Sequence, residues 1–218
     1  MNKILTALAG MLFIALASSA AQADWTLNQS NLSTGGATCF NGQVVGGTPS
    51  VLVTTPNTCF RRTLDGVTGV GTNVGVPGEI GITPDKLRFE FDRNVFVTEL
   101  QIAFLYPDGE YNDVGDEVAK IVLLDDLDTV IADFFFYADS KTTGFLADDL
   151  GGTDNGTAWA NLGIAQDGVN DGGAGGGGHW QIGLAADGVS IFGDFRTMEI
   201  YGVSEPQPFG DNRDSDFG

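Results

Sequence analysis

The acidic segment between Pro107 and Val118 carries side chains that are well suited to binding a cation. Calcium takes about six to eight oxygen ligands, and alternate oxygen-bearing residues on a tight loop can direct several of them at one point. The segment departs from the EF-hand loop, because Asp113 stands where that loop has glycine and Ala119 where it has glutamate. A structural calcium site is one hypothesis for this segment, and a solvated acidic loop is the other. The candidate ligands are Asp108, Glu110, Asn112, Asp113, Asp116 and Glu117.

Residues that could perform acid–base catalysis are few. His179 is the one histidine, and no serine or cysteine stands in a recognisable nucleophile motif. Neither G-x-S-x-G nor H-E-x-x-H occurs. The 29 Asp and Glu residues would supply some carboxylate pair for glycoside hydrolysis by chance, and nothing in the sequence singles out one pair. The sequence therefore favours a protein that is not an enzyme.

Three tryptophans could serve as platforms for carbohydrate, because sugars stack on aromatic ring faces. Trp159 is the best candidate for ligand binding, since it lies in the polar loop segment 154–159. Trp180 alternates with Ile182, which predicts a core position instead. The consecutive residues Phe134, Phe135 and Phe136 cannot all face one core, so we expect at least one of these rings to point away from it.

Cys39 and Cys59 are the two cysteines of the chain. A structural zinc site needs about four ligands, and His179 is the only histidine that could join the pair. In an oxidising compartment the two cysteines are expected to form a disulfide, which would contribute about 3 kcal/mol by restricting the unfolded chain. We therefore predict a disulfide that staples an irregular N-terminal region.

The first 23 residues have the order of a secretory signal peptide: Lys3, an apolar run from Ile4 to Ala17, and the small residues Ala21-Gln22-Ala23. Their removal would take away Lys3 and shift the formal net charge from −19 to −20. Such an acidic chain is unsuited to nucleic acid, which selects basic surfaces. No second apolar run is long enough to span a membrane. The sequence predicts a secreted protein, extracellular or at a bacterial cell surface, without a membrane span in the mature chain.

Alternating apolar residues predict several β-strands. Leu87, Phe89 and Phe91 alternate with charged residues, and a strand over 95–106 would place Phe96, Leu100 and Ile102 on one face. Segments 117–124 and 129–137 are expected to form a hairpin around an acidic turn. Further strands are expected at 51–54, 179–185 and 196–203.

These strands, with no convincing amphipathic helix, predict an all-β fold: one antiparallel β-sandwich or jelly-roll-like domain with long glycine-rich loops. The domain would span residues 24–203. We expect a loosely structured, disulfide-containing part at 24–80, core strands at 85–139, glycine-rich loops at 140–178 and closing strands at 179–203. The acidic tail at 204–218 has little to bury and is expected to be disordered.

Short motifs in the central part resemble those of bacterial exported surface proteins of the PEP-CTERM, exosortase-associated type. They are Gly69-Val70-Gly71, Lys86-Leu87-Arg88-Phe89-Glu90-Phe91, Val95-Phe96-Val97-Thr98-Glu99-Leu100 and a final strand like Met198-Glu199-Ile200-Tyr201-Gly202-Val203-Ser204. The resemblance covers about half of the chain. It departs at the end, where Ser204-Glu205-Pro206-Gln207-Pro208 leads into an acidic tail in place of the family's apolar anchor. The resemblance implies a non-catalytic surface β-sandwich and supplies no active-site residues.

Together these features predict a non-catalytic, secreted structural or adhesive protein of a cell surface or extracellular matrix, self-assembling into a matrix or filament through sheet edges. The alternative is an extracellular carbohydrate-binding module, stabilised by calcium, in which Trp159 meets a polysaccharide. A glycosidase is the third hypothesis.

Overall fold

The computed structural model describes residues 27, 29–32, 38–39, 41–46, 49–64, 67–72, 80, 85–102, 105, 118–140, 143–148, 163–166, 179–182 and 191–203. Within these residues the chain is almost entirely β-strand, and every strand pair is antiparallel. The one helix in this part, α1 (Gln29–Leu32), has four residues. The all-β antiparallel class predicted from the sequence is confirmed.

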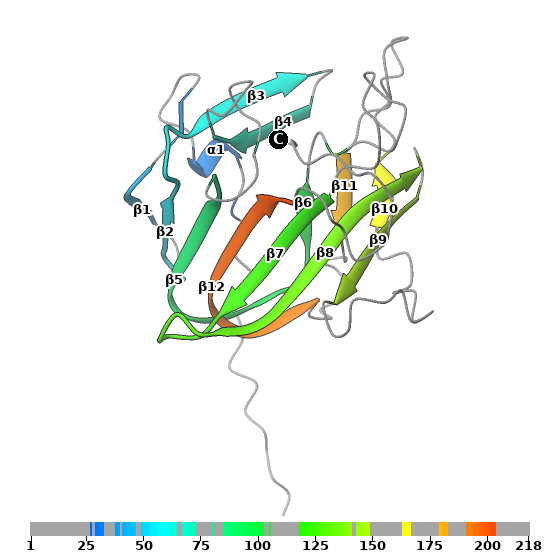
Figure 1. The fold of residues 1–218 in the computed structure, drawn as a ribbon. Coiled ribbons are helices and arrows are strands. Elements are labelled where there is room, and N and C mark those ends of the chain that lie inside the picture. Colours follow the sequence, from blue (N-terminus) through cyan, green and yellow to red (C-terminus); the bar gives the residue numbers. More distant parts are fainter. Residues whose placement is uncertain are drawn as a thin grey trace, which may run out of the picture.

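A seven-stranded sheet forms the centre of the molecule, in the order β1-β2-β5-β12-β7-β8-β9 (Figure 1). Its middle consists of long strands rich in Val, Ile, Leu and Phe, the residue types that favour a pleated surface. The strands are β1 (Gln43–Val45), β2 (Val51–Thr54), β5 (Leu87–Val97), β12 (Phe192–Gly202), β7 (Val118–Leu124), β8 (Val130–Ser140) and β9 (Thr143–Asp148).

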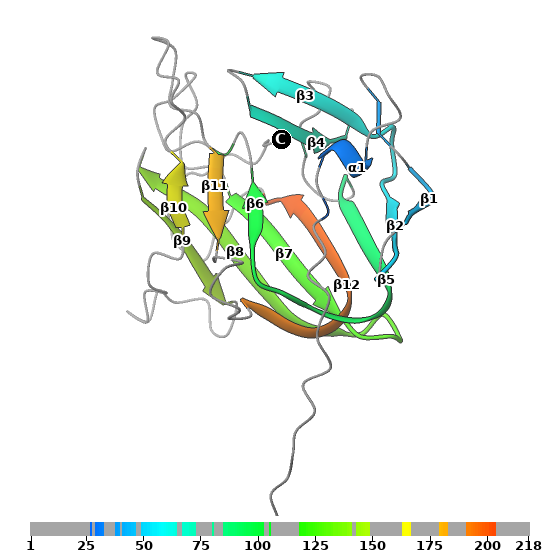
Figure 2. The same ribbon diagram turned by 180° about the vertical axis from the view of Figure 1, so that it is seen from behind.

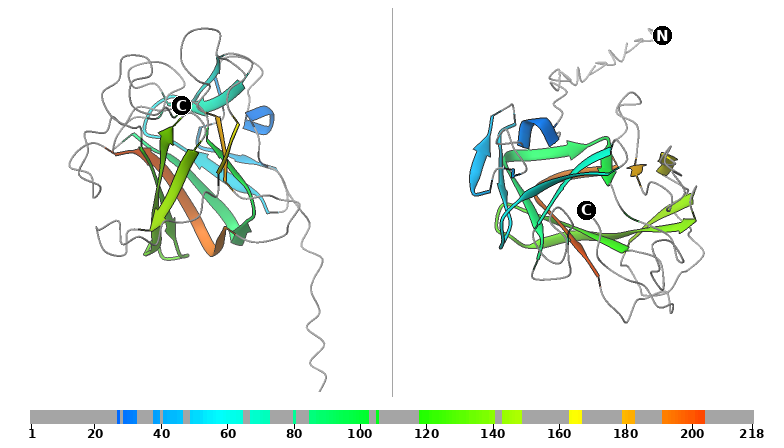
Figure 3. Two further views of the ribbon diagram at one scale, coloured as in Figure 1. Left: turned by 90° about the vertical axis from the view of Figure 1, so that its right-hand side faces the viewer. Right: turned by 90° about the horizontal axis from the view of Figure 1, so that it is seen from above.

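Two smaller sheets accompany the large one. The three-stranded sheet β10-β11-β6 contains Gly163–Gln166, His179–Ile182 and Leu100–Ile102, and the two-stranded sheet pairs β3 (Phe60–Leu64) with β4 (Val67–Gly71). The large sheet is curved, and the three-stranded sheet lies on its concave side near β8 and β9 (Figures 2 and 3). The sandwich or jelly-roll arrangement itself stays a prediction.

The hydrophobic core lies between these sheets. Trp180 of β11 is 1% exposed, its ring contacts the Phe136 ring edge to face at 5.7 Å, and its indole N–H donates to the carbonyl of Leu105 at 2.7 Å. A buried indole whose N–H finds a partner keeps its large apolar contact area without leaving a donor unpaired. The core position predicted for Trp180 is confirmed. Other core residues are Val51, Val53, Leu87, Phe89, Phe91, Ile121, Leu123, Phe195, Met198 and Ile200.

The hairpin predicted for 117–124 and 129–137 is confirmed as β7 and β8, which pair from Val118 and Tyr137 to Leu124 and Val130. Phe136 faces the core, whereas Phe135 is buried outside it with the ammonium of Lys120 lying 4.8 Å from its ring centre. The expectation that one ring of this phenylalanine run turns away from the core is therefore confirmed.

The strand predicted over 95–106 is wrong. Val95 to Val97 belong to the end of β5, the chain leaves strand geometry at Thr98 and Glu99, and β6 begins at Leu100. Val95 is buried, while Phe96 is 49% exposed. The faces are reversed because the pairing of β5 with β12 shifts register in this region.

Strands also occur where composition suggested loops. The described residues of segment 24–80, expected to be loosely structured, contribute β1 to β4, and those of segment 140–178 contribute β9 and β10. Pairing with neighbours distant in sequence orders these short segments, and that information is absent from local composition.

Candidate functional site

The paired ends of β5 and β12 deviate most from regular sheet geometry. Phe195 pairs with Val95 and Thr197 with Glu90, so Arg196 alone stands opposite the four residues 91–94. A second register shift separates Phe192 from Phe195, and Asp194 between them has a φ of 55°. Bulges of this kind redirect side chains and are frequent beside functional sites. The exposed residues of this irregularity are a candidate binding surface.

We name as the bulge surface the exposed residues Asp92, Arg93, Asn94, Phe96, Gly193 and Asp194. One edge of the Phe96 ring packs at Gly193, where an added Cβ would lie 2.9 Å from ring atom Cδ1 and 3.1 Å from Cε1. The Asn94 side-chain amide donates to the Asp194 carboxylate at 3.0 Å. An exposed ring and two polar side chains therefore lie side by side on these two strands.

Asp92 fixes the start of this surface to β2. Its carboxylate accepts from Arg93 Nε at 2.8 Å and from Ser50 Oγ at 2.9 Å, and its backbone N–H donates to the Ser50 carbonyl at 3.0 Å. Hydrogen bonds from Arg93 first, and then from Ser50, lower the pKa of Asp92 to about 2. The same contact with Asp92 raises the pKa of Arg93. These two residues form a stable ion pair at ordinary pH.

The turn between β7 and β8 is held by Asp125. Its carboxylate accepts from the backbone N–H groups of Leu127 and Thr129 at 2.9 and 2.8 Å, and its backbone N–H donates to the Thr129 carbonyl at 3.0 Å. The two backbone donors, Thr129 first, lower the pKa of the Asp125 carboxyl. Asp128 adopts a φ of 62°, a left-handed conformation that aspartate tolerates better than most residues. The turn therefore has a defined shape at neutral pH.

This turn presents three apolar side chains to solvent, which we name the hairpin tip: Leu127 at 80% exposed, Val130 at 56% and Ile131 at 48%. With Phe96, they are four of the five large apolar side chains found exposed in the described part of the chain, the fifth being Val44. The β7–β8 turn, the end of β5 and the beginning of β12 lie at the same end of the large sheet (Figure 1). Exposed apolar groups are therefore concentrated at this end.

An ionic network on the outer face of the large sheet braces the hairpin tip. Glu199 of β12 accepts from Lys86 Nζ at 2.6 Å and from Arg88 Nη1 at 2.9 Å, while Arg88 Nη2 reaches Asp128 in the turn. Burial alone would lower the pKa of Arg88, but its hydrogen bonds and charge contacts with Asp128 and Glu199 outweigh burial and raise it. The network joins β5, β12 and the turn, so the base of the hairpin tip is fixed by charged groups.

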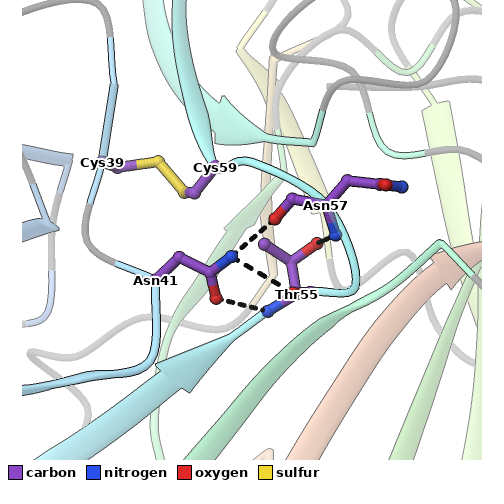
Figure 4. Close-up of a disulfide and its surroundings, with 5 residues drawn as sticks. All are labelled: Cys39, Asn41, Thr55, Asn57 and Cys59. Carbon is purple, nitrogen blue, oxygen red and sulfur yellow. Dashed lines mark hydrogen bonds between the residues drawn. A yellow bond between two sulfur atoms is a disulfide. The ribbon is translucent and has the colours of Figure 1, made fainter.

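The disulfide between Cys39 and Cys59 is confirmed, and both cysteines are buried. Beside it the Asn41 side-chain amide donates to the carbonyls of Thr55 and Asn57, and its oxygen accepts from the Thr55 N–H at 3.0 Å (Figure 4). The backbone N–H of Cys39 also donates to the Cys59 carbonyl at 3.0 Å. The covalent bond and these hydrogen bonds hold one corner of the molecule together.

Asp85 is a buried carboxylate that sequence reasoning missed. It is 3% exposed, accepts from the Asn57 amide at 3.0 Å and also accepts a hydrogen bond from the Thr72 hydroxyl. Its three flanking segments are distant in sequence, so no local pattern could identify it. Because hydrogen bonds to neighbouring elements satisfy this carboxylate, it acts as a structural tie between the start of β5 and the segments that hold Asn57 and Thr72.

Most site residues predicted from the sequence lie outside the described residues. These are Trp159 and all six candidate calcium ligands, Asp108, Glu110, Asn112, Asp113, Asp116 and Glu117. His179 begins β11. In the part of the chain that the structure describes, no group of three or more His, Cys, Asp or Glu side chains is placed to hold a metal ion. No helix of that part has the length and apolar character needed to cross a membrane.

Comparison of the chain with protein-family models, with curated proteins and with solved structures found no match. The geometry of the described residues is therefore the basis for a functional proposal.

Proposed function

We propose that this chain is a non-catalytic, exported structural or adhesive protein of a cell surface or extracellular matrix. The observation that carries the proposal is the hairpin tip, where a turn locked by Asp125 and braced through Arg88 holds Leu127, Val130 and Ile131 out to solvent. An exposed apolar group on a rigid support indicates a contact surface, because its ordering cost has been met before a partner arrives.

The chemistry of the described charged groups supports a scaffold. Glu199 and Asp85 are both buried, and each binds side chains from other parts of the fold. The disulfide agrees with an oxidising compartment, which is where such bonds persist. The signal-peptide pattern and the PEP-CTERM resemblance point in the same direction.

The partner that we propose for the hairpin tip is a second copy of this chain. An apolar patch can pack on its own copy across a two-fold axis, since it carries no charge pattern that must be matched by an opposite one. The net charge of −19 opposes such association at low ionic strength, and salt screens that repulsion. Association through the hairpin tip should therefore increase as salt is added.

The first prediction concerns the mass of the full chain in solution. Light scattering coupled to size exclusion should show dimers or larger assemblies whose fraction grows between about 0.01 M and about 1 M salt, as the screening length shortens. Leu127→Ser should abolish this growth, because it removes the most exposed apolar side chain of the hairpin tip. Val44→Ser removes an exposed valine from edge strand β1 and should leave the growth unchanged.

Negative-stain microscopy of the same samples, with and without added calcium, separates closed dimers from filaments. A chain that stays monomeric at every salt concentration and with calcium would overturn self-assembly. Growth that persists in Leu127→Ser and disappears in Val44→Ser would move the contact to the sheet edge.

A carbohydrate-binding module is the second candidate function. The residue on which the sequence based it, Trp159, lies outside the described residues. The exposed ring of Phe96 is the described feature that favours it.

A further inference from the structure

We infer that the bulge surface around Phe96 is a contact site for a neutral saccharide. This inference is independent of self-assembly through the hairpin tip. It rests on three properties of the two paired strands, namely an exposed aromatic ring, adjacent planar polar side chains and a backbone irregularity that holds both in place.

The ring supplies the apolar half of the site. Phe96 is 49% exposed even though it belongs to a strand of the large sheet, and the ring edge formed by Cδ1 and Cε1 packs where Gly193 has no side chain. Any larger residue at position 193 would have to displace the ring. Saccharides present C–H faces that pack on aromatic rings, and an exposed ring seated on a neighbouring strand suits that contact.

The polar half consists of Asn94 and Asp194. Their mutual hydrogen bond of 3.0 Å uses one amide hydrogen and one carboxylate oxygen. An Asn amide has a second donor and a carbonyl acceptor, and a carboxylate has several acceptor positions. The two side chains can therefore exchange hydrogen bonds with adjacent hydroxyl groups while they remain bonded to each other.

The backbone explains why these side chains lie together on the surface. Register shifts on both sides of the Phe195 and Val95 pair redirect residues 92–94 and 193–194 away from regular pairing. Asp194 keeps a left-handed φ of 55°, which is unfavourable for a residue with a side chain. Strain of this type is common where a fold positions groups for a ligand.

Charge decides which class of saccharide fits. Asp92 and Arg93 are paired with each other, and Asp194 adds a negative charge to a chain whose formal net charge is −19. Polyanionic glycans would be repelled by this field at moderate ionic strength. The site therefore favours uncharged polysaccharides over acidic ones.

The second prediction is tested by native gel electrophoresis of the full chain through gels that contain dextran, soluble starch or galactomannan. We expect retardation by at least one of these neutral polymers and none by alginate or hyaluronan. Phe96→Ala should weaken binding about tenfold, the equivalent of one lost ring contact. Gly193→Ala should weaken it less, since its new Cβ displaces the ring without removing it. Phe96→Tyr should retain it.

Leu127→Ser is the matched control, because it removes an exposed apolar side chain from the same end of the sheet and should leave retardation unchanged. Thermal unfolding of each variant verifies that it is folded. The inference is overturned if no neutral polymer retards the chain, if Phe96→Ala is retarded as strongly as the unaltered protein, or if Trp159→Ala abolishes retardation while Phe96→Ala does not. Light scattering of the same variants tests self-assembly separately, and Phe96→Ala should leave it intact.

Discussion

Single residues of the bulge surface owe their properties to contacts across strands. The Asp92 carboxyl receives hydrogen bonds from its neighbour Arg93 and from Ser50, just before β2. A third prediction follows for its titration. NMR of the Asp92 carboxyl should give a midpoint of about 2, and Arg93→Gln should move this midpoint toward the ordinary value of 3.8. Ser50→Ala should move it less, because Arg93 is the larger cause.

The sign of the effect on stability is fixed by the direction of this shift. Because folding lowers the pKa of Asp92, its contribution is present above pH 3.8 and is lost as pH falls toward about 2. Asp92→Asn should therefore differ from the unaltered protein in stability at neutral pH and converge with it in strong acid. A midpoint near 3.8 in the unaltered protein would contradict the described contacts.

At the scale of residues, the sequence identified what depends on alternation or on pairing chemistry. Trp180 and the Cys39–Cys59 bond are both confirmed. Phe96 was assigned to the wrong face, since strict alternation from Leu100 and Ile102 ignores the break at Thr98 and Glu99. Asp85 could not be found, because its partners Asn57 and Thr72 come from other segments.

Strands β5 and β12 are joined on their outer face by a buried carboxylate with two cationic partners. The fourth prediction is that Glu199→Gln lowers the free energy of unfolding by about 1 to 3 kcal/mol, because Lys86 and Arg88 lose the charge that they share. Urea unfolding followed by circular dichroism measures this change.

The control for Glu199 lies on the same strand face. Glu90 is 3.7 Å from Arg88 Nη2, and its side chain is 45% exposed. Solvent screens an exposed pair of this kind, so Glu90→Gln should change stability by less than about 1 kcal/mol. Equal losses in the two variants would mean that burial of Glu199 is not what gives the network its strength.

Elements that are long and regular were predictable. The β7–β8 hairpin was recognised from two apolar runs around an acidic turn, and β2 was placed within its observed bounds, Val51–Thr54. Strands β9 and β10 were not, since glycine-rich segments have low strand propensity and become strands only when neighbours supply hydrogen bonds. Most site residues suggested by sequence lie outside the described part, so the bulge surface and the hairpin tip emerged from the structure alone.

The whole molecule depends on pairing between distant segments, and the disulfide is its one covalent cross-link. The fifth prediction is that replacing both Cys39 and Cys59 by Ala lowers the free energy of unfolding by about 3 kcal/mol, the value expected for a loop of this length. Chemical unfolding with and without reductant gives the same comparison in the unaltered protein. Identical unfolding curves would show that hydrogen bonding at this corner suffices.

Strand order could not be derived from the sequence. The central pairs of the large sheet bring β5 beside β12 and β12 beside β7, although β12 is the last strand of the chain. Periodicity shows which residues of a strand are buried and carries no information about which strand lies beside it. The fold class was therefore accessible to prediction, whereas the arrangement of sheets was not.

The Asn41–Gly42 pair next to the disulfide has a further consequence for the lifetime of the protein. Asparagine followed by glycine is prone to spontaneous deamidation, because the unhindered glycine nitrogen can attack the side-chain carbonyl carbon to form a succinimide. Here the Gly42 N–H donates to the Val53 carbonyl at 2.8 Å, and both ends of the Asn41 amide are bonded to the segment 55–57. The native fold therefore suppresses ring closure, and isoaspartate at this position would accumulate as a chemical record of how long that corner had stood open.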